Sequence, residues 1–216
     1  MASAGKIYLI VYNVVQLFCW ATGFTELVRC LLTKEDLWTV VGPGLKIYQT
    51  LAILEIVHTV VGLVKSSPAI TSFQVFSRLM VLWGALAYSE SARQSVGFPM
   101  LFGAWTLAEM IRYSFYLAAL FKKQPYPLVW LRYSMFIILY PLGVAGELLV
   151  MYNTLPKVAA EQPFASLAPG DLNWAYYAYV AIMVLYIPVF PVLYGHMLSQ
   201  RKKALGPAVQ PRKRRD

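Results

Sequence analysis

The stretch from residue 128 to residue 155, LVWLRYSMFIILYPLGVAGELLVMYNTL, decides the fold class of this chain. It contains only two charged side chains, Arg132 and Glu147. Roughly 20 mostly apolar residues are enough to cross a bilayer as a helix. A carboxyl group inside such a span costs about 2.5 kcal/mol or more on insertion scales, which makes it a candidate functional group. The stretch therefore predicts a membrane-spanning helix with a functional carboxyl group.

The composition of the whole chain also indicates a membrane protein. Of its 216 residues, 59% are hydrophobic and 13% are charged, whereas a soluble domain carries about 25% charged residues. We predict an all-α integral membrane bundle of six transmembrane helices, a domain of residues 1–200, and a basic cytosolic tail of residues 201–216. The six expected spans are residues 6–32, 44–64, 71–88, 98–121, 128–155 and 174–199.

The distribution of basic residues predicts the orientation of the bundle. With six spans both termini lie on one side, which then holds 11 of the 19 basic residues. The opposite loops hold only Lys34, Arg93 and Lys157. Because basic loops stay in the cytosol, we expect both termini to be cytosolic.

The C-terminal tail supplies seven of those basic residues and allows three interpretations. Lys213-Arg214-Arg215-Asp216 approximates a dibasic retrieval signal of the endoplasmic reticulum. The tail could also attract anionic lipid or a phosphate-rich substrate, or it could fix the topology as a stop-transfer flank. The sequence leaves all three open.

Tyr140 and Glu147 form the candidate site within the fifth span. They are two helical turns apart, so they face the same side of the helix at about 10 Å along its axis. This separation is too long for a mutual hydrogen bond but suits two groups that bracket a small reacting fragment. Pro141 favours a kink between them, and Gly143 and Gly146 let either a ligand or a neighbouring helix approach closely.

Other ionisable residues within the spans are supporting candidates. Glu109 and Arg112 are three apart on one helix and can partly neutralise each other. Three more have no local partner of opposite charge and must find one on a neighbouring span or in a water-filled cavity: Glu55, Arg78 and Arg132.

Several classes of catalytic site do not fit this sequence. Its two histidines, His58 and His196, cannot build the imidazole cluster of a di-iron enzyme. It has no phosphate-cradling glycine loop, His-Glu-x-x-His or Gly-x-Ser-x-Gly motif. We therefore expect acid–base chemistry without a metal or cofactor, and no nucleic-acid partner.

Motifs spread over residues 6–203 resemble one family. They comprise Tyr140-Pro141-x-Gly143 with Glu147, Leu54-Glu55-Ile56-Val57-His58, Glu109-Met110-Ile111-Arg112-Tyr113-Ser114, Trp130-Leu131-Arg132-Tyr133-Ser134 and Tyr186-Ile187-Pro188. This combination is similar to the membrane (3R)-3-hydroxyacyl-CoA dehydratases, also called protein-tyrosine-phosphatase-like proteins. The resemblance implies a six-span protein of the endoplasmic reticulum membrane. It also implies removal of water from (3R)-3-hydroxyacyl-CoA to give trans-2-enoyl-CoA during elongation of very-long-chain fatty acids.

The resemblance assigns roles to individual residues. It makes Tyr140 and Glu147 the catalytic pair. For the dehydration itself we expect Glu147 to be the base and Tyr140 the donor to the hydroxyl or the thioester oxygen, although the reverse assignment and a double role for Glu147 stay open. Supporting or substrate-positioning candidates are Glu55, Arg78, Arg112, Arg132 and Gly143. The three arginines could tune Glu147 or bind phosphate, and structural ion pairing is the alternative for all three. The implied partners are an acyl-CoA substrate, the fatty acid elongase, the ketoacyl and enoyl reductases of the cycle, and membrane lipid.

The depth of the pair predicts the shape of the site. With the fifth span entering from the cytosol near Trp130, Tyr140 lies about 15 Å and Glu147 about 25 Å into the helix. Coenzyme A is polar and cytosolic, so we expect a pocket that opens to the cytosol and is closed toward the lumen.

Two other functions compete with the dehydratase. A catalytically silent scaffold of an elongation complex would need neither Tyr140 nor Glu147, and both are present. A small transporter also places ionisable residues and a kinked helix at mid-membrane. Internal repeats would favour the transporter, but the two halves of the chain show no similarity.

Overall fold

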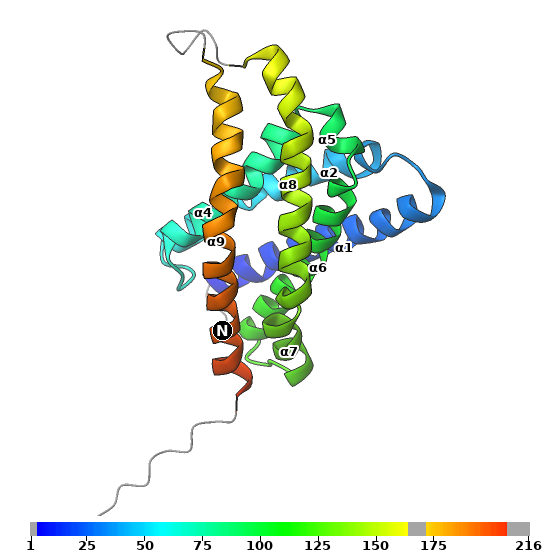
Figure 1. Ribbon diagram of the computed structural model, residues 1–216. Helices are drawn as coiled ribbons and strands as arrows, with labels where there is room; N and C mark the ends of the chain where they lie inside the picture. Colours follow the sequence, from blue (N-terminus) through cyan, green and yellow to red (C-terminus); the bar gives the residue numbers. More distant parts are fainter. Residues whose placement is uncertain (1–3, 164–171, 207–216) are drawn as a thin grey trace, which may run out of the picture.

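The computed structural model describes residues 4–163 and 172–206, and every regular element in this part of the chain is helical (Figure 1). The prediction of an all-α protein is therefore confirmed for the described residues. The retrieval pattern at residues 213–216 lies outside them. The elements are α1 (Ala4–Thr33), α2 (Leu37–Leu51), α3 (Ile53–Val60), α4 (Pro68–Leu79), the π-helix η1 (Met80–Leu86), α5 (Glu90–Gln94), α6 (Gly97–Leu120), α7 (Tyr126–Ser134), α8 (Phe136–Glu161) and α9 (Trp174–Leu205).

Five helical segments of the described chain are long and apolar enough to cross a membrane. They are Ala4–Thr33, Leu37–Val60, Pro68–Leu86, Tyr126–Glu161 and Trp174–Leu205. α6 coincides with the remaining expected span, is 24 residues long and carries Glu109 and Arg112. The chain is thus a multi-helix membrane protein.

Several helices extend further than the expected spans because local contacts stabilise their ends. α2 begins at Leu37 because the Asp36 carboxylate accepts a hydrogen bond from the backbone N–H of Thr39 at 2.7 Å and caps the helix. α8 continues to Glu161, where Lys157 forms an ion pair one turn away at 3.2 Å. α9 runs through residue 200 to Leu205, so the first residues of the expected tail are helical.

α6 is the central helix of the bundle and packs against both α1 and α8. The contact with α8 is unusually close. A Cβ added to Gly146 would lie 2.6 Å from the backbone nitrogen of Leu101 and 2.8 Å from the carbonyl oxygen of Gly97. In Figure 1, α8 and α9 run side by side, whereas α1 and α2 run obliquely to them.

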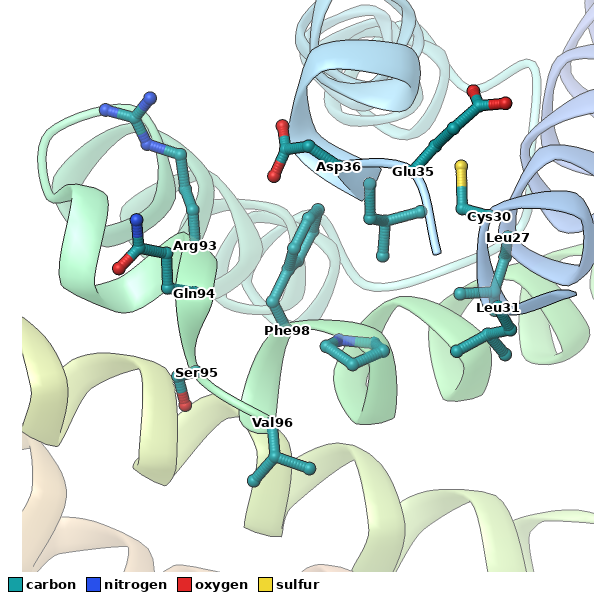
Figure 2. A pocket seen from close by; sticks show the side chains of 12 residues that line it. Leu27, Cys30, Leu31, Glu35, Asp36, Arg93, Gln94, Ser95, Val96 and Phe98 are labelled. Atoms are coloured by element: carbon teal, nitrogen blue, oxygen red, sulfur yellow. The ribbon is translucent and has the colours of Figure 1, made fainter. Parts of the chain in front are cut away.

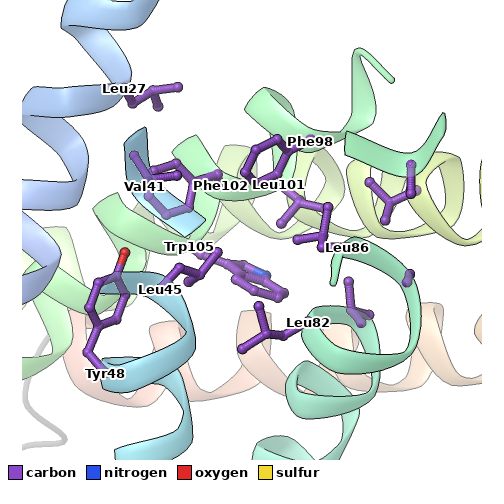
Figure 3. Packing of buried hydrophobic residues seen from close by; sticks show 14 of the residues in the cluster. Leu27, Val41, Leu45, Tyr48, Leu82, Leu86, Phe98, Leu101, Phe102 and Trp105 are labelled. Carbon is purple, nitrogen blue, oxygen red and sulfur yellow. The ribbon is translucent and has the colours of Figure 1, made fainter. Parts of the chain in front are cut away.

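The apolar core gathers around α6. Figure 3 shows Phe98, Phe102 and Trp105 of α6 beside Leu45 of α2 and Leu82 of η1. All five side chains are 3% exposed or less. The core therefore holds the indole ring of Trp105 in place, and this ring contacts the candidate site.

Two pockets mark opposite ends of the bundle. One, of about 410 Å³, is lined by Lys6, Leu63 and Lys122, which brings the N-terminus together with the α3–α4 and α6–α7 turns. The other, of about 340 Å³, lies between the loop before α2 and the chain from α5 into α6 (Figure 2). This arrangement is the one expected when the chain crosses the bundle back and forth.

Candidate functional site

Glu147 accepts a hydrogen bond on each of its carboxylate oxygens. Trp105 Nε1 on α6 donates to Oε1 at 2.8 Å, and the Tyr186 hydroxyl on α9 donates to Oε2 at 2.7 Å. A carboxylate that accepts on both oxygens shows the pattern of an ionised group. The donors come from two different helices, so the packing of α6 and α9 against α8 fixes the orientation of Glu147.

Tyr140 lies against an aromatic stack on α9. Its ring is parallel to that of Phe190, with a centroid distance of 5.1 Å and an interplanar angle of 3°, and lies 6.3 Å from the ring of Tyr194. Tyr140 and Glu147 thus both face α9. Among the described contacts, no hydrogen bond joins the two, as their spacing predicts.

An ion-pair network lies behind Glu147. The Arg78 guanidinium lies 5.6 Å from the centre of the Trp105 ring and forms an ion pair with Glu109. Arg112 then bonds Glu109 on its own helix. Arg78 therefore reaches the Glu147 environment through the indole that holds the carboxylate.

The network continues from Arg112 to α3. Arg112 donates two hydrogen bonds to the Glu55 carboxylate, at 2.6 and 2.8 Å. The Tyr113 hydroxyl donates to the same carboxylate at 2.6 Å. The expectation that Glu55 and Arg78 find partners on neighbouring helices is confirmed.

The remaining supporting candidates lie elsewhere. Arg132 is partly buried on α7, more than four helical turns before Glu147 and toward the basic end of the bundle. A Cβ added to Gly143 would meet the Cβ of Ala104 at 3.5 Å, so Gly143 faces α6 and not α9. The structure thus brings Arg78 close to Glu147. Arg132 lies far from Glu147 along the helix, and Gly143 faces α6 on another side of α8.

The roles of Trp105, Phe190 and Tyr194 were missed by the sequence analysis. Tyr186, Phe190 and Tyr194 recur every fourth residue and so form an aromatic stripe on one face of a helix, which the spacing could have shown. Trp105 gave no such signal, because only the packing of α6 on α8 directs its indole toward Glu147.

The two pockets described above are not lined by the catalytic candidates. The pocket in Figure 2 is lined by Asp36, Arg93 and Phe98 among others and does not include Tyr140 or Glu147. Within residues 4–163 and 172–206, no three His, Cys, Asp or Glu side chains gather where they could hold a metal ion. The chemistry available at Glu147 is that of a carboxylate, an indole and phenols.

Comparison with known proteins places this geometry in a family. Residues 49–207 match the family model described as protein tyrosine phosphatase-like protein, PTPLA. The chain belongs to this family. The PTPLA match includes every residue of the Glu147 site and of the ion network, but none of α1.

Relatives of the chain are known in animals and plants. It is 44% identical to very-long-chain (3R)-3-hydroxyacyl-CoA dehydratase 2 of Homo sapiens, over 92% of this chain and 80% of that one. It is 42% identical to very-long-chain (3R)-3-hydroxyacyl-CoA dehydratase hpo-8 of Caenorhabditis elegans, over 92% of this chain and 94% of that one. It is 36% identical to very-long-chain (3R)-3-hydroxyacyl-CoA dehydratase PASTICCINO 2A of Oryza sativa, over 94% of this chain and 95% of that one. No solved structure matches the chain significantly.

Proposed function

We propose that this protein is a hydro-lyase that dehydrates (3R)-3-hydroxyacyl-CoA to trans-2-enoyl-CoA in the elongation of very-long-chain fatty acids. The observation that carries the proposal is the Glu147 carboxylate, held by Trp105 and Tyr186 on the same face as Tyr140. The names of the relatives from three organisms agree with it.

The pair can perform the two proton transfers of a dehydration. Glu147 removes the proton from the α carbon, and Tyr140 donates its hydroxyl proton to the departing β-hydroxyl, which leaves as water. The carbon–carbon double bond forms as the β carbon–oxygen bond breaks. The proton taken by Glu147 returns to Tyr140 before the next turnover.

We assign the base to Glu147 because its carboxylate accepts a hydrogen bond on each oxygen, which is the pattern of an ionised group without a proton of its own. Tyr140 has a hydroxyl that can donate either to the β-hydroxyl or to the thioester oxygen, on which negative charge develops. This assignment keeps each group in one role through the reaction.

The proposed topology follows from the same arrangement. α6 would join the five long apolar segments as a membrane span, which brings their number to six. Both termini would then lie in the cytosol with Lys6, Lys122 and the end of α9. The site would then open toward the cytosol, where coenzyme A thioesters are found, and the acyl chain would extend into the apolar interior.

The reaction also sets the partners and the compartment. An elongase and a ketoacyl reductase must supply the 3-hydroxyacyl-CoA, and an enoyl reductase must consume the product. We place the protein with these enzymes in the endoplasmic reticulum membrane.

A dehydration assay on purified protein in detergent tests the proposal. Wild type should convert a long-chain (3R)-3-hydroxyacyl-CoA but not its (3S) isomer. Tyr140→Phe and Glu147→Gln should each lose enoyl-CoA formation, whereas Tyr152→Phe should keep it, because Tyr152 is 63% exposed on the same helix. Equal activity in all four proteins would place the chemistry elsewhere.

A further inference from the structure

The interface between α8 and α9 extends well beyond Tyr140 and Glu147. The two helices run antiparallel, and the interface continues along α7 at the basic end. Side-chain hydrogen bonds cross this interface at four levels, joining Arg201 to Ser134, Tyr194 to Ile137, Tyr186 to Glu147 and Asn173 to Val158. The face that carries the catalytic pair therefore reaches the end of the bundle where the basic residues gather.

Arg132 lies on the same helical stripe as the catalytic face. Phe136 packs against Tyr194 at 5.7 Å, and Tyr140 follows Phe136 by one turn and packs against the same ring. Arg132 precedes Phe136 by one turn, and Met135 between α7 and α8 keeps helical φ and ψ angles of −64° and −24°. The periodicity thus continues back to Arg132.

Arg201 occupies the corresponding position on α9. Tyr186, Phe190, Tyr194 and Arg201 are spaced by four, four and seven residues, so they share one face of that helix. Arg201 follows Tyr186 by as many residues as Arg132 precedes Glu147, about 22 Å along either helix. The two arginines therefore end the interface at about the same level.

The two guanidinium groups have donor capacity to spare. Arg201 uses Nε to donate to Ser134 Oγ at 3.1 Å. Within the described residues, neither its two terminal nitrogens nor the Arg132 guanidinium forms a hydrogen bond or ion pair with protein. Both side chains are partly buried. A guanidinium group presents a planar fork of donors that matches a phosphate.

We propose that Arg132 and Arg201 bind the phosphate groups of the coenzyme A moiety, an inference that rests on the proposed function. In coenzyme A the extended pantetheine arm separates the phosphates from the thioester. The interface has a matching order: cations at its end, the aromatic rings of Phe136, Tyr140, Phe190 and Tyr194 in the middle, and Glu147 at depth. The arm lies along the aromatic rings, and the thioester lies beside the catalytic pair.

Phospholipid headgroups carry the same phosphate chemistry and lie at the same depth as helix ends. The test therefore uses phospholipid-free detergent and compares two substrates with one acyl chain, 3-hydroxyacyl-CoA and 3-hydroxyacyl-pantetheine, which lacks the phosphates. Arg132→Gln and Arg201→Gln are compared with Arg29→Gln. Arg29 is an exposed arginine on α1, and it pairs with Glu26 on the same helix and with Glu35 in the link that follows.

Each variant at Arg132 or Arg201 should raise the KM for the coenzyme A substrate about tenfold, since a hydrogen bond to a charged group contributes about that factor. The kcat should stay the same, and both constants for the pantetheine substrate should be unchanged. Arg132→Lys should restore part of the lost affinity because it keeps the charge without the fork. Arg29→Gln should behave as wild type.

Equal changes with both substrates, or no change with either, would overturn the proposal. A melting temperature that falls in the variants and depends on added phospholipid, without a coenzyme A-selective effect, would assign the arginines to lipid headgroups. Calorimetric binding of free coenzyme A tests the arginines even if wild type dehydrates neither substrate. Loss of that binding in Arg132→Gln and Arg201→Gln would support the phosphate site while the proposed function failed.

Discussion

At the scale of single residues, the two donors to Glu147 determine how well the carboxylate is placed for proton abstraction. Trp105 is held in the core by apolar side chains of α6, α2 and η1. Tyr186 lies on α9, a helix without a buried residue among those described. One donor is therefore rigid, and the other depends on how α9 packs against α8.

Trp105→Phe and Tyr186→Phe each remove one hydrogen bond to Glu147 and leave most of the ring in place. We expect each to lower kcat by roughly 10- to 100-fold with little change in KM, because a hydrogen bond to a charged group is worth about 1.5–3 kcal/mol. Steady-state kinetics on 3-hydroxyacyl-CoA would show this split. Trp130→Phe is the matched control, since Trp130 is 42% exposed on α7. A rise in KM alone would mean that the two side chains bind substrate and do not orient the base.

The residue scale also shows how far the sequence could predict the site. The spacing of Tyr140 and Glu147 placed them on one face of a helix, and both do face α9. The partners of Glu147 were not predictable in the same way, because Trp105 and Tyr186 are 42 and 39 residues away in the chain. Hydrogen bonds of that separation depend on which helices pack together, and local periodicity carries no such information.

At the scale of helices, the charged network fastens α3 and α4 to α6. Glu109 is only 1% exposed, and its carboxylate is paired with Arg78 and Arg112. The sequence predicted the pair within α6 and the need of Glu55 and Arg78 for outside partners. It could not predict that Arg112 also pairs with Glu55, because this depends on where α3 lies relative to α6.

Arg112→Gln should destabilise the protein by about 3–5 kcal/mol, because it leaves Glu55 and Glu109 as partly or fully buried charges without Arg112. Unfolding in detergent would measure the loss. Adding Glu55→Gln should recover part of the stability, since it removes one of the uncompensated charges. If Arg112→Gln unfolded like the control Arg29→Gln, the network would contribute nothing to stability.

The N-terminus of α2 gives a pH-dependent test of a single cap. The hydroxyl and the backbone N–H of Thr39 donate to Asp36 and hold the pKa of its carboxyl below the usual value. A lowered folded-state pKa adds stability above the unfolded value of about 3.9, and this stability is lost as the pH falls through the folded value.

Asp36→Ala should therefore cost about 1 kcal/mol at pH 7, with the difference from wild type shrinking below about pH 4. Asp36→Asn keeps a capping oxygen and should lose little at either pH. Unfolding in detergent at the two pH values measures both variants. A cost of Asp36→Ala that did not change with pH would show that the cap does not depend on the carboxylate charge.

At the scale of the whole molecule, the two ends of the bundle differ in charge. One end holds Lys6, Lys122 and the last turn of α9 with Lys202 and Lys203, whereas the other holds Asp36 and Glu35 beside Arg93. The sequence predicted this asymmetry from the order of the spans. It underestimated the extent of α8 and α9. At the end of α8 a distant residue, Tyr88, donates to Glu161 in addition to the local ion pair with Lys157, and the sequence pattern does not show this contact.

The asymmetry predicts which end faces the cytosol. In a background with Cys19 and Cys30 changed to serine, Lys123→Cys should react with an impermeant maleimide in sealed microsomes. Lys34→Cys should react only after the membrane is permeabilised. Both lysines are exposed in the structure. The opposite pattern would invert the topology and close the proposed route for coenzyme A.

The central claim is that Tyr140 and Glu147 act together in one chemical step, and a double-variant comparison tests it most directly. The measurement is kcat/KM for a long-chain (3R)-3-hydroxyacyl-CoA in Tyr140→Phe, Glu147→Gln and the double variant. We predict that each single variant loses roughly 10²–10⁴-fold. The double variant should lose no more kcat/KM than the more impaired of the two single variants, because the effects of groups that act as a unit are not additive. Wild-type activity in either single variant, or losses that multiply in the double variant, would contradict the account.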